Sequence, residues 1–319
     1  MATKKEIRGM LLHLGRNLWS EKTAAGHLRC DDEVWKSTTD QMAREGLNLA
    51  LVDLGEGLQY PSHPELAVEG SWSVERMRKE IARLKEMGIE AVPKLNFSAT
   101  HDLWLKEYHR MISTPEYYKV CADLIRDVCE IFGAPRLIHL GFDEEDYANQ
   151  RSWEFCAIRQ GELWWHDFLW FVGQAEKSGM RPWIWSDKVW FHPDEFMKRM
   201  PRSVLQSGWY YGRRFDLENM HEDDRAIMRT NSESGKRTKL LSFIDMDKAG
   251  FDQVPCGANY SCEENIGSMV SFCRKHLSAE RLKGFLMTSW YALMPDTPKK
   301  KNRTRNIRAV ELAGEAFGR

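Results

Sequence analysis

The feature that most constrains the fold is a regular alternation of short apolar runs with segments of helical periodicity. The first apolar run covers residues 9–14, and the segment after it places Val34, Thr38 and Met42 on one helical face. This pattern is typical of βα units, in which each helix packs back onto a parallel sheet. We therefore expect an α/β fold.

Eight apolar runs predict eight strands. They cover residues 9–14, 47–52, 89–93, 136–140, 183–185, 204–206, 240–244 and 284–288. Eight strands with interleaved helices predict a (β/α)8 TIM barrel, and such barrels reach 319 residues as one domain, so we expect a single domain over 1–319. A doubly wound open sheet is the competing fold, but no glycine-rich phosphate-binding fingerprint follows any run.

Local signals predict where two of the helices begin and where a long loop lies. Thr114 followed by Pro115 opens a helix as its N-cap and first residue. Ser261 and Glu264 have the spacing of a capping box for a later helix. The segment 210–238 is polar and irregular, and it predicts a long loop with a short helix.

Charge and hydropathy indicate which partners the chain lacks. The formal net charge is −1, so no strong attraction to nucleic acid or an anionic membrane is expected. The basic run 299–305 is interpreted as a solvated loop. The first residues lack the apolar stretch of a signal peptide, and no run of about eighteen apolar residues occurs. We expect a cytoplasmic protein without nucleic-acid or membrane partners, and we leave a homodimer open.

The cysteines give no sign of a metal site or a disulfide framework. There are seven of them, scattered and without a CxxC pair, so zinc-ligand spacing is absent. Free thiols suit a reducing compartment. We expect no metal and no cofactor.

Functional side chains of a β/α barrel lie where strands end and the following loops begin. At those positions the sequence offers Arg16, Asp53, Asn96, His101, Asp143, Glu144, Trp185, Asp187, Trp209, Asp245 and Trp290. This set suits hydrolysis of a glycosidic bond, because an acid can protonate the leaving oxygen while carboxylates stabilise developing positive charge. The 13 Trp residues fit a sugar site, since indole stacks on sugar C–H faces, although large barrels also bury many aromatic rings.

Four successive acids, residues 143–146, follow the fourth apolar run. Such a cluster can simply stabilise a helix N-terminus, where the helix dipole favours negative charge. In a partly desolvated barrel mouth, however, adjacent carboxylates push their pKa values apart, so that one stays ionised while its neighbour keeps a proton. We therefore predict that Asp143 and Glu144 are catalytic.

The segment 139–144 resembles the His-x-Gly-Gly-Asp-Glu motif of the family 20 glycoside hydrolases, the β-N-acetylhexosaminidases. Phe142 stands where the motif has its second Gly. The resemblance implies that Glu144 is the general acid/base and that Asp143 orients the substrate's own 2-acetamido group, which attacks as nucleophile and forms an oxazolinium intermediate. It also implies a supporting role for His139 and an exo-acting, retaining enzyme that removes terminal GlcNAc or GalNAc.

Other stretches resemble the family in the same order along the chain. Residues 8–16 are similar to its first strand, which implies that Arg16 grips sugar hydroxyls, although His13 replaces the customary Asp. Residues 88–93 are similar to its third strand, and His101 follows one place later than the family's His.

The predicted aromatic and acidic contacts to substrate complete the site. Trp185, Trp209 and Trp290 resemble the indoles that enclose the N-acetyl methyl group and the sugar face, whereas Trp183 is expected to face the helices. Asp187 and Asp245 are predicted to bind substrate as well. The family's Glu after its last Trp is Ala292 here, and its acetamido-binding Tyr has three candidates in this chain, Tyr210, Tyr211 and Tyr260.

Three function classes remain open at this point. The first is the substrate-assisted hexosaminidase. The second is another retaining glycosidase, in which Asp53, Asp187 or Asp245 attacks as a protein nucleophile opposite Glu144. The third is a catalytically silent barrel that binds sugar, which the departures from the family pattern suggest.

Overall fold

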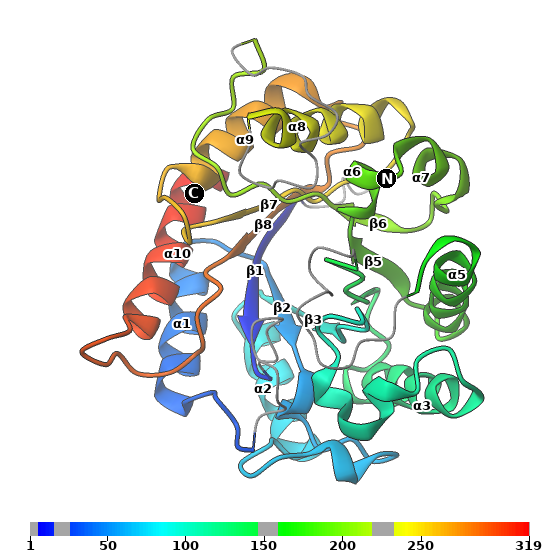
Figure 1. The fold of residues 1–319 in the computed structure, drawn as a ribbon. Coiled ribbons are helices and arrows are strands. Elements are labelled where there is room, and N and C mark those ends of the chain that lie inside the picture. The colour runs from blue at the N-terminus through cyan, green and yellow to red at the C-terminus, as the bar shows by residue number, and fades with distance from the viewer. Residues whose placement is uncertain (1–5, 16–25, 146–158, 219–232, 319) are drawn as a thin grey trace.

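The computed structural model describes residues 6–15, 26–145, 159–218 and 233–318, and Figure 1 shows its ribbon. Eight parallel strands form one sheet in the order β6-β5-β4-β3-β2-β1-β8-β7. They are β1 (Ile7–His13), β2 (Leu49–Asp53), β3 (Glu90–Lys94), β4 (Leu137–His139), β5 (Arg181–Trp185), β6 (Leu205–Ser207), β7 (Cys256–Ala258) and β8 (Gly284–Thr288).

The two outer strands of this order meet and close the sheet on itself. The backbone N–H of Cys256 donates a hydrogen bond to the carbonyl of Gly208 (2.9 Å), and that of Val254 donates to the carbonyl of Gln206 (2.8 Å). Parallel bridges join the same segments. The expected (β/α)8 TIM barrel is confirmed.

The helices surround the barrel on its outside (Figure 1). They are α1 (Asp32–Arg44), α2 (Val74–Glu86), α3 (Pro115–Ile131), α5 (Gly161–Lys177), α6 (Lys188–Phe191), α7 (Pro193–Arg199), α8 (Glu233–Lys248), α9 (Asn265–His276) and α10 (Asn302–Phe317), with short 3-10 turns η1 (Gly55–Gly57), η2 (Pro64–Leu66) and η3 (Leu103–Arg110). The predicted N-cap of α3 is present, since the Thr114 side chain accepts from the backbone N–H of Tyr117. Among the described residues, no helix is both long and apolar enough to cross a bilayer.

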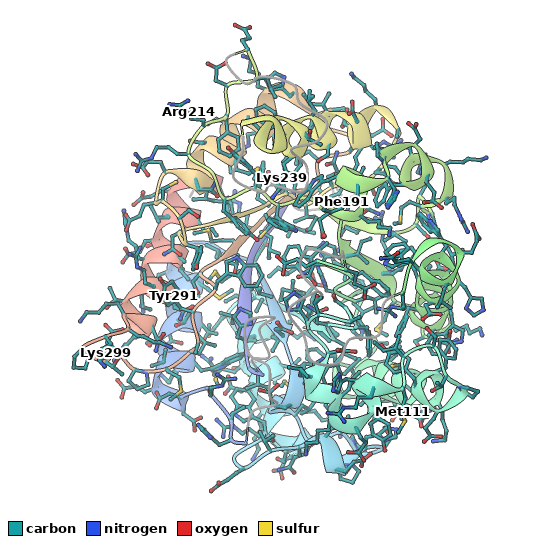
Figure 2. The ribbon with its side chains drawn as sticks, viewed as in Figure 1. Met111, Phe191, Arg214, Lys239, Tyr291 and Lys299 are labelled. Carbon is teal, nitrogen blue, oxygen red and sulfur yellow. The ribbon has the colours of Figure 1, made fainter. Side chains whose placement is uncertain are left out.

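Two apolar cores lie on opposite faces of the sheet. One fills the barrel, with Leu11, Leu51 and Val92 among its members, and the other lies between the strands and the helices. Side chains occupy both spaces in Figure 2. Trp183 and Trp185 both belong to the barrel interior, so the expectation that Trp183 faces the helices is wrong. Residues two apart in a strand share a face.

The prediction of a strand over 240–244 is also wrong, because these residues lie within α8. Leu240 and Phe243 are buried at a spacing of three, which suits a helix face, and a short apolar run does not distinguish helix from strand. The seventh strand is instead Cys256–Ala258, a run too small and short to stand out. The α8 helix also begins inside the predicted loop 210–238.

Two further details differ from expectation at the outer helices. Glu264 is the N-cap residue of α9 but forms no side-chain capping hydrogen bond, so the predicted capping box is absent. Residues 299–301 of the basic run are exposed. Lys299 lies at the edge of the molecule in the loop before α10 (Figure 2).

Candidate active site

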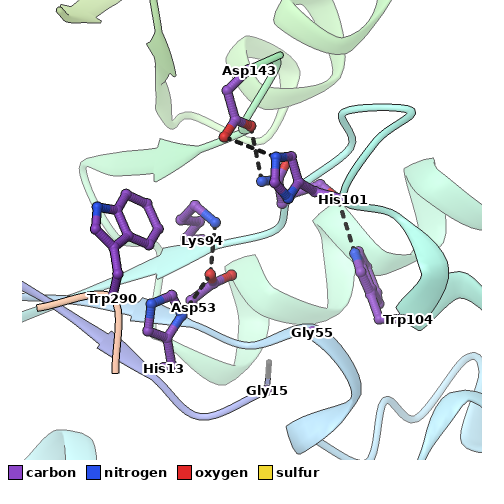
Figure 3. Close-up of a pocket in the computed structure, with 10 residues that line it drawn as sticks. His13, Gly15, Asp53, Gly55, Lys94, His101, Trp104, Asp143 and Trp290 are labelled. Atoms are coloured by element: carbon purple, nitrogen blue, oxygen red, sulfur yellow. Dashed lines mark hydrogen bonds and ion pairs between the residues drawn. The ribbon is translucent and has the colours of Figure 1, made fainter. Parts of the chain in front are cut away.

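The loops that follow β3 and β4 bring one histidine and two acids together. His101 Nε2 lies 3.1 Å from Glu144 Oε2 and 3.3 Å from Asp143 Oδ2. Figure 3 shows His101 beside Asp143. The three side chains offer ligand atoms within 4.8 Å of one another, a spacing that a divalent cation could also use. Here the histidine serves as the positive partner of both carboxylates.

Asp143 is held from two sides by the β3 loop. Asn96 Nδ2 donates to its Oδ1 (3.0 Å), while the hydroxyl of Thr100 (3.2 Å) and that of Ser98 donate to its backbone carbonyl. Asp143 is only 7% exposed. Its carboxylate therefore keeps one orientation with its His101 contact, as a preorganised site requires.

The turn that carries the two acids has an unusual backbone. Gly141, Phe142 and Glu144 have φ values of 79°, 67° and 57°. At Gly141 a Cβ would come 1.9 Å from the Asn96 side chain, so only glycine fits. The Phe142 ring packs edge-on against Trp164 and other rings of α5, and this burial offsets the backbone strain.

A buried ion pair beneath the acids joins the two loops. Arg159 is fully buried and binds Glu145 Oε1, and it also donates to the carbonyl of Phe97 (2.8 Å). The same Glu145 oxygen accepts from the backbone N–H of Ala99 (2.7 Å). Glu145 belongs to the acidic cluster seen in the sequence, but the sequence does not show that its side chain is buried. Arg159 was not predicted, because its partners are known only from the fold.

The charges of the site shift two pKa values upward. Burial by itself would lower the pKa of His101, but the Asp143 and Glu144 carboxylates outweigh it and raise the pKa to about 9. Burial raises the pKa of Asp187, and the charges of Asp143 and Glu144 add to it, giving about 8. His101 is thus a cation and Asp187 a neutral acid at pH 7.

A row of polar side chains forms the floor of the site. In the strand register, His13 pairs with Asp53, Asp53 with Lys94, and Lys94 with His139. Lys94 Nζ lies 2.7 Å and His13 Nδ1 3.2 Å from Asp53 Oδ2 (Figure 3). Burial would raise the pKa of Asp53, but Lys94 and His13 hold it well below its usual range. Lys94 was not among the site residues predicted from the sequence.

His139 supports the turn that carries the two acids from inside the barrel. It is fully buried, and its Nδ1 accepts a hydrogen bond from the backbone N–H of Gly141 (3.0 Å). Burial, followed by the Lys94 charge, lowers the pKa of His139 well below its usual value. The neutral ring therefore fixes the first residue of the turn.

Aromatic rings form the wall of the site opposite the acids. The ring of Trp290 lies 6.1 Å from that of Trp185 and 6.2 Å from that of Tyr211. Trp209 stacks on Tyr211 at 5.2 Å. Of the three tyrosine candidates, Tyr211 faces the site, whereas Tyr260 is 61% exposed and the ring of Tyr210 packs on Phe215.

Two predicted site residues stand apart from this arrangement. Asp245 lies on the outer helix α8, where its side chain is 55% exposed and 4.0 Å from Lys248, so its predicted contact with substrate is wrong. It followed from the mistaken strand over 240–244. Arg16 lies outside the described residues, although Gly15 before it lines the pocket together with Asp53, Lys94, His101, Asp143 and Trp290.

Comparison with known proteins gives structural similarity only. No protein-family model and no curated protein sequence matches the chain. A chitobiase of Flavobacterium johnsoniae matches with a TM-score of 0.65 at 18% identity, over 98% of this chain and 48% of that one. A GH20 exo-β-N-acetylglucosaminidase of Vibrio harveyi matches with a TM-score of 0.64 at 14% identity, over 98% and 54%.

Dispersin B is similar over nearly its whole length, with a TM-score of 0.59 and 16% identity over 98% of this chain and 99% of that one. The present chain spans only about half the length of the chitobiase and the Vibrio harveyi enzyme. It has the (β/α)8 barrel fold of the GH20 β-N-acetylhexosaminidase structures.

Proposed function

We propose that the chain is an exo-acting, retaining β-N-acetylhexosaminidase that removes terminal GlcNAc or GalNAc. The observation that carries the proposal is the arrangement of His101, Asp143 and Glu144 at the carboxyl ends of β3 and β4. The pocket beside them is lined by His101, Asp143 and Trp290, so charged groups and an indole ring face the same space, as a sugar site requires.

In the proposed reaction Glu144 gives its proton to the glycosidic oxygen as the bond to the anomeric carbon breaks. The carbonyl oxygen of the substrate's acetamido group forms the new bond to that carbon. Asp143 accepts a hydrogen bond from the acetamido N–H and stabilises the positive charge of the oxazolinium ring. Glu144 then takes a proton from water, whose oxygen attacks the same carbon and opens the ring with net retention.

The other side chains of the site balance charge or contact the sugar in this reaction. The His101 cation balances the two carboxylates once Glu144 has given up its proton. The rings of Trp185, Trp290 and Tyr211 form an apolar wall for the acetamido methyl group and a sugar face. Lys94 supplies N–H donors for sugar hydroxyls.

The geometry gives less support to a protein nucleophile. Asp53 is paired with Lys94 and His13, and Asp245 lies on an outer helix. Asp187 accepts a hydrogen bond from the Glu144 backbone and is neutral at pH 7. None of these three carboxylates is presented as a free, ionised nucleophile.

Turnover of a small panel of chromogenic glycosides tests the proposal. We expect cleavage of an aryl β-N-acetylglucosaminide or its galactosaminide, and no cleavage of an aryl β-galactoside, because only the first two carry the acetamido nucleophile. Preference for the galactoside would contradict the proposal. Sugar binding without any turnover would indicate a silent barrel instead.

A further inference from the structure

Asp187 follows β5, and its side chain reaches across to the turn that carries the catalytic acids. Its Oδ2 accepts a hydrogen bond from the backbone N–H of Glu144 at 2.9 Å. Glu144 has a φ of 57°, a conformation that residues other than glycine rarely adopt. The contact thus helps to hold Glu144 in its strained position. The backbone of β5 also holds the start of the same turn, since Trp185 N–H donates to the carbonyl of Gly141 (3.0 Å).

The position of the Asp187 carboxyl disfavours a negative charge. The residue is 3% exposed, and its Oδ1 has no hydrogen-bond partner in the described part of the chain. Two carboxylates face it from the β4 loop, those of Asp143 and Glu144. The nearest cation along the chain, Lys188, points its Nζ over the Trp164 ring at 4.7 Å instead of pairing with Asp187. Burial and these two negative charges raise the pKa of Asp187 to about 8.

We propose that Asp187 is a positioning residue that works as a neutral acid, fixing Glu144 through its backbone without adding a third negative charge to the site. This role rests on the proposed function, in which Glu144 must both give and take a proton. An ionised Asp187 beside it would favour retention of that proton and oppose its transfer. The role replaces both direct substrate binding and nucleophilic attack as the task of this residue.

Two variants separate the hydrogen bond from the charge. Asp187→Asn keeps an acceptor oxygen and is neutral at every pH, whereas Asp187→Leu has similar size but no acceptor. Hydrogen exchange at the Glu144 amide reports on the contact without any substrate. We expect exchange to stay slow in Asp187→Asn and to accelerate about tenfold in Asp187→Leu, since one hydrogen bond is lost. Unchanged exchange in Asp187→Leu would show that the contact does not position Glu144.

The protonation state is tested by unfolding in denaturant at several pH values. Because the folded protein keeps the Asp187 proton up to about pH 8 while the unfolded chain loses it near pH 4, wild-type stability falls as pH rises between them. Asn cannot ionise, so Asp187→Asn should gain stability relative to wild type from pH 5 to pH 8. Asp245→Asn, at a position that is 55% exposed, is the matched control for the loss of a carboxyl group. If the stability difference between Asp187→Asn and wild type does not change with pH, Asp187 is not a neutral acid in the folded protein.

Kinetics on an aryl β-N-acetylglucosaminide then link the contact to turnover. Asp187→Leu should lose about a hundredfold in kcat with little change in KM, as expected of a misplaced acid. Asp187→Asn should recover most of this loss, and it should lack the loss of activity that ionisation of Asp187 near pH 8 causes in wild type. Equal losses in the two variants would contradict the proposal. If wild type cleaves no such substrate, the proposed function fails, while exchange and unfolding still decide the role of Asp187.

Discussion

One residue of the turn shows how packing can stabilise an unfavourable backbone conformation. Phe142 occupies a position with a φ of 67°, where the family pattern has glycine. Its ring is 2% exposed in an aromatic cluster with residues of α5, and this packing stabilises a backbone that would otherwise be unfavourable. The sequence predicted the neighbouring acids from the motif, but the fit of Phe142 depends on rings far along the chain.

The first prediction concerns the proton that Glu144 transfers in the proposed reaction. Glu144→Gln keeps the shape of the side chain but removes the transferable proton, and a positioned acid contributes about 10²- to 10⁴-fold to rate. Turnover of glycosides with poor leaving groups should fall by that factor, while an activated aryl glycoside should be affected much less. The comparison requires kcat for both substrates with each protein. Equal rates of the two proteins on the poor substrate would show that Glu144 is not the acid.

The second prediction concerns how the charge of His101 affects the stability of the folded protein. Its pKa of about 9 in the fold lies above the value of about 6.5 in an unfolded chain. The protonated His101 therefore stabilises the folded protein by about 3 kcal/mol. This contribution is complete below about pH 6.5 and disappears as pH rises through 9.

The variant His101→Gln isolates this effect from other titrating groups. Unfolding in denaturant should show that the stability difference between wild type and variant shrinks from pH 6 to pH 9. A difference that is independent of pH would mean that His101 is neutral in the folded protein.

At the scale of elements, the sequence predicted strands well where apolar runs and helix signals alternate clearly. The eighth strand, Gly284–Thr288, has the predicted bounds. The strand predicted over 240–244 is wrong because the periodicity of this run suits a helix equally well. The true strand β7 has only three residues. That error carried Asp245 into the predicted site. An error of element type thus becomes an error of function when a strand end is used to find site residues.

The loops after β3 and β4 are joined by Arg159 and Glu145, which gives a third prediction. Arg159→Met leaves the Glu145 carboxylate buried without its cation, and removing one partner of a buried pair costs about 3–5 kcal/mol. Denaturant unfolding should show this loss. The control Arg136→Met breaks an exposed pair with Glu90 and should cost under about 1 kcal/mol. Similar losses in the two variants would mean that the buried pair does not hold the loops together.

For the whole molecule, the barrel explains why residues far apart in sequence form one site. His13, Asp53, Lys94 and His139 lie at matching positions on four successive strands. The alternation of runs predicted the barrel, and the barrel predicted that strand ends converge. It could not predict that Lys94 pairs with Asp53, because the relative register of neighbouring strands follows from packing around the closed sheet.

The central claim, that the substrate supplies its own nucleophile, is tested most directly by comparing two reagents. A thiazoline mimic of the cyclised sugar resembles the proposed oxazolinium intermediate and the transition states on either side of it, so it should bind wild type much more tightly than substrate does. In Asp143→Asn this affinity should fall and kcat should drop by about a hundredfold, since one preorganised charge is lost. A fluorinated sugar without the acetamido group should leave the protein mass unchanged. A stable covalent adduct on Asp53, Asp187 or Asp245, with no inhibition by the thiazoline, would contradict the account.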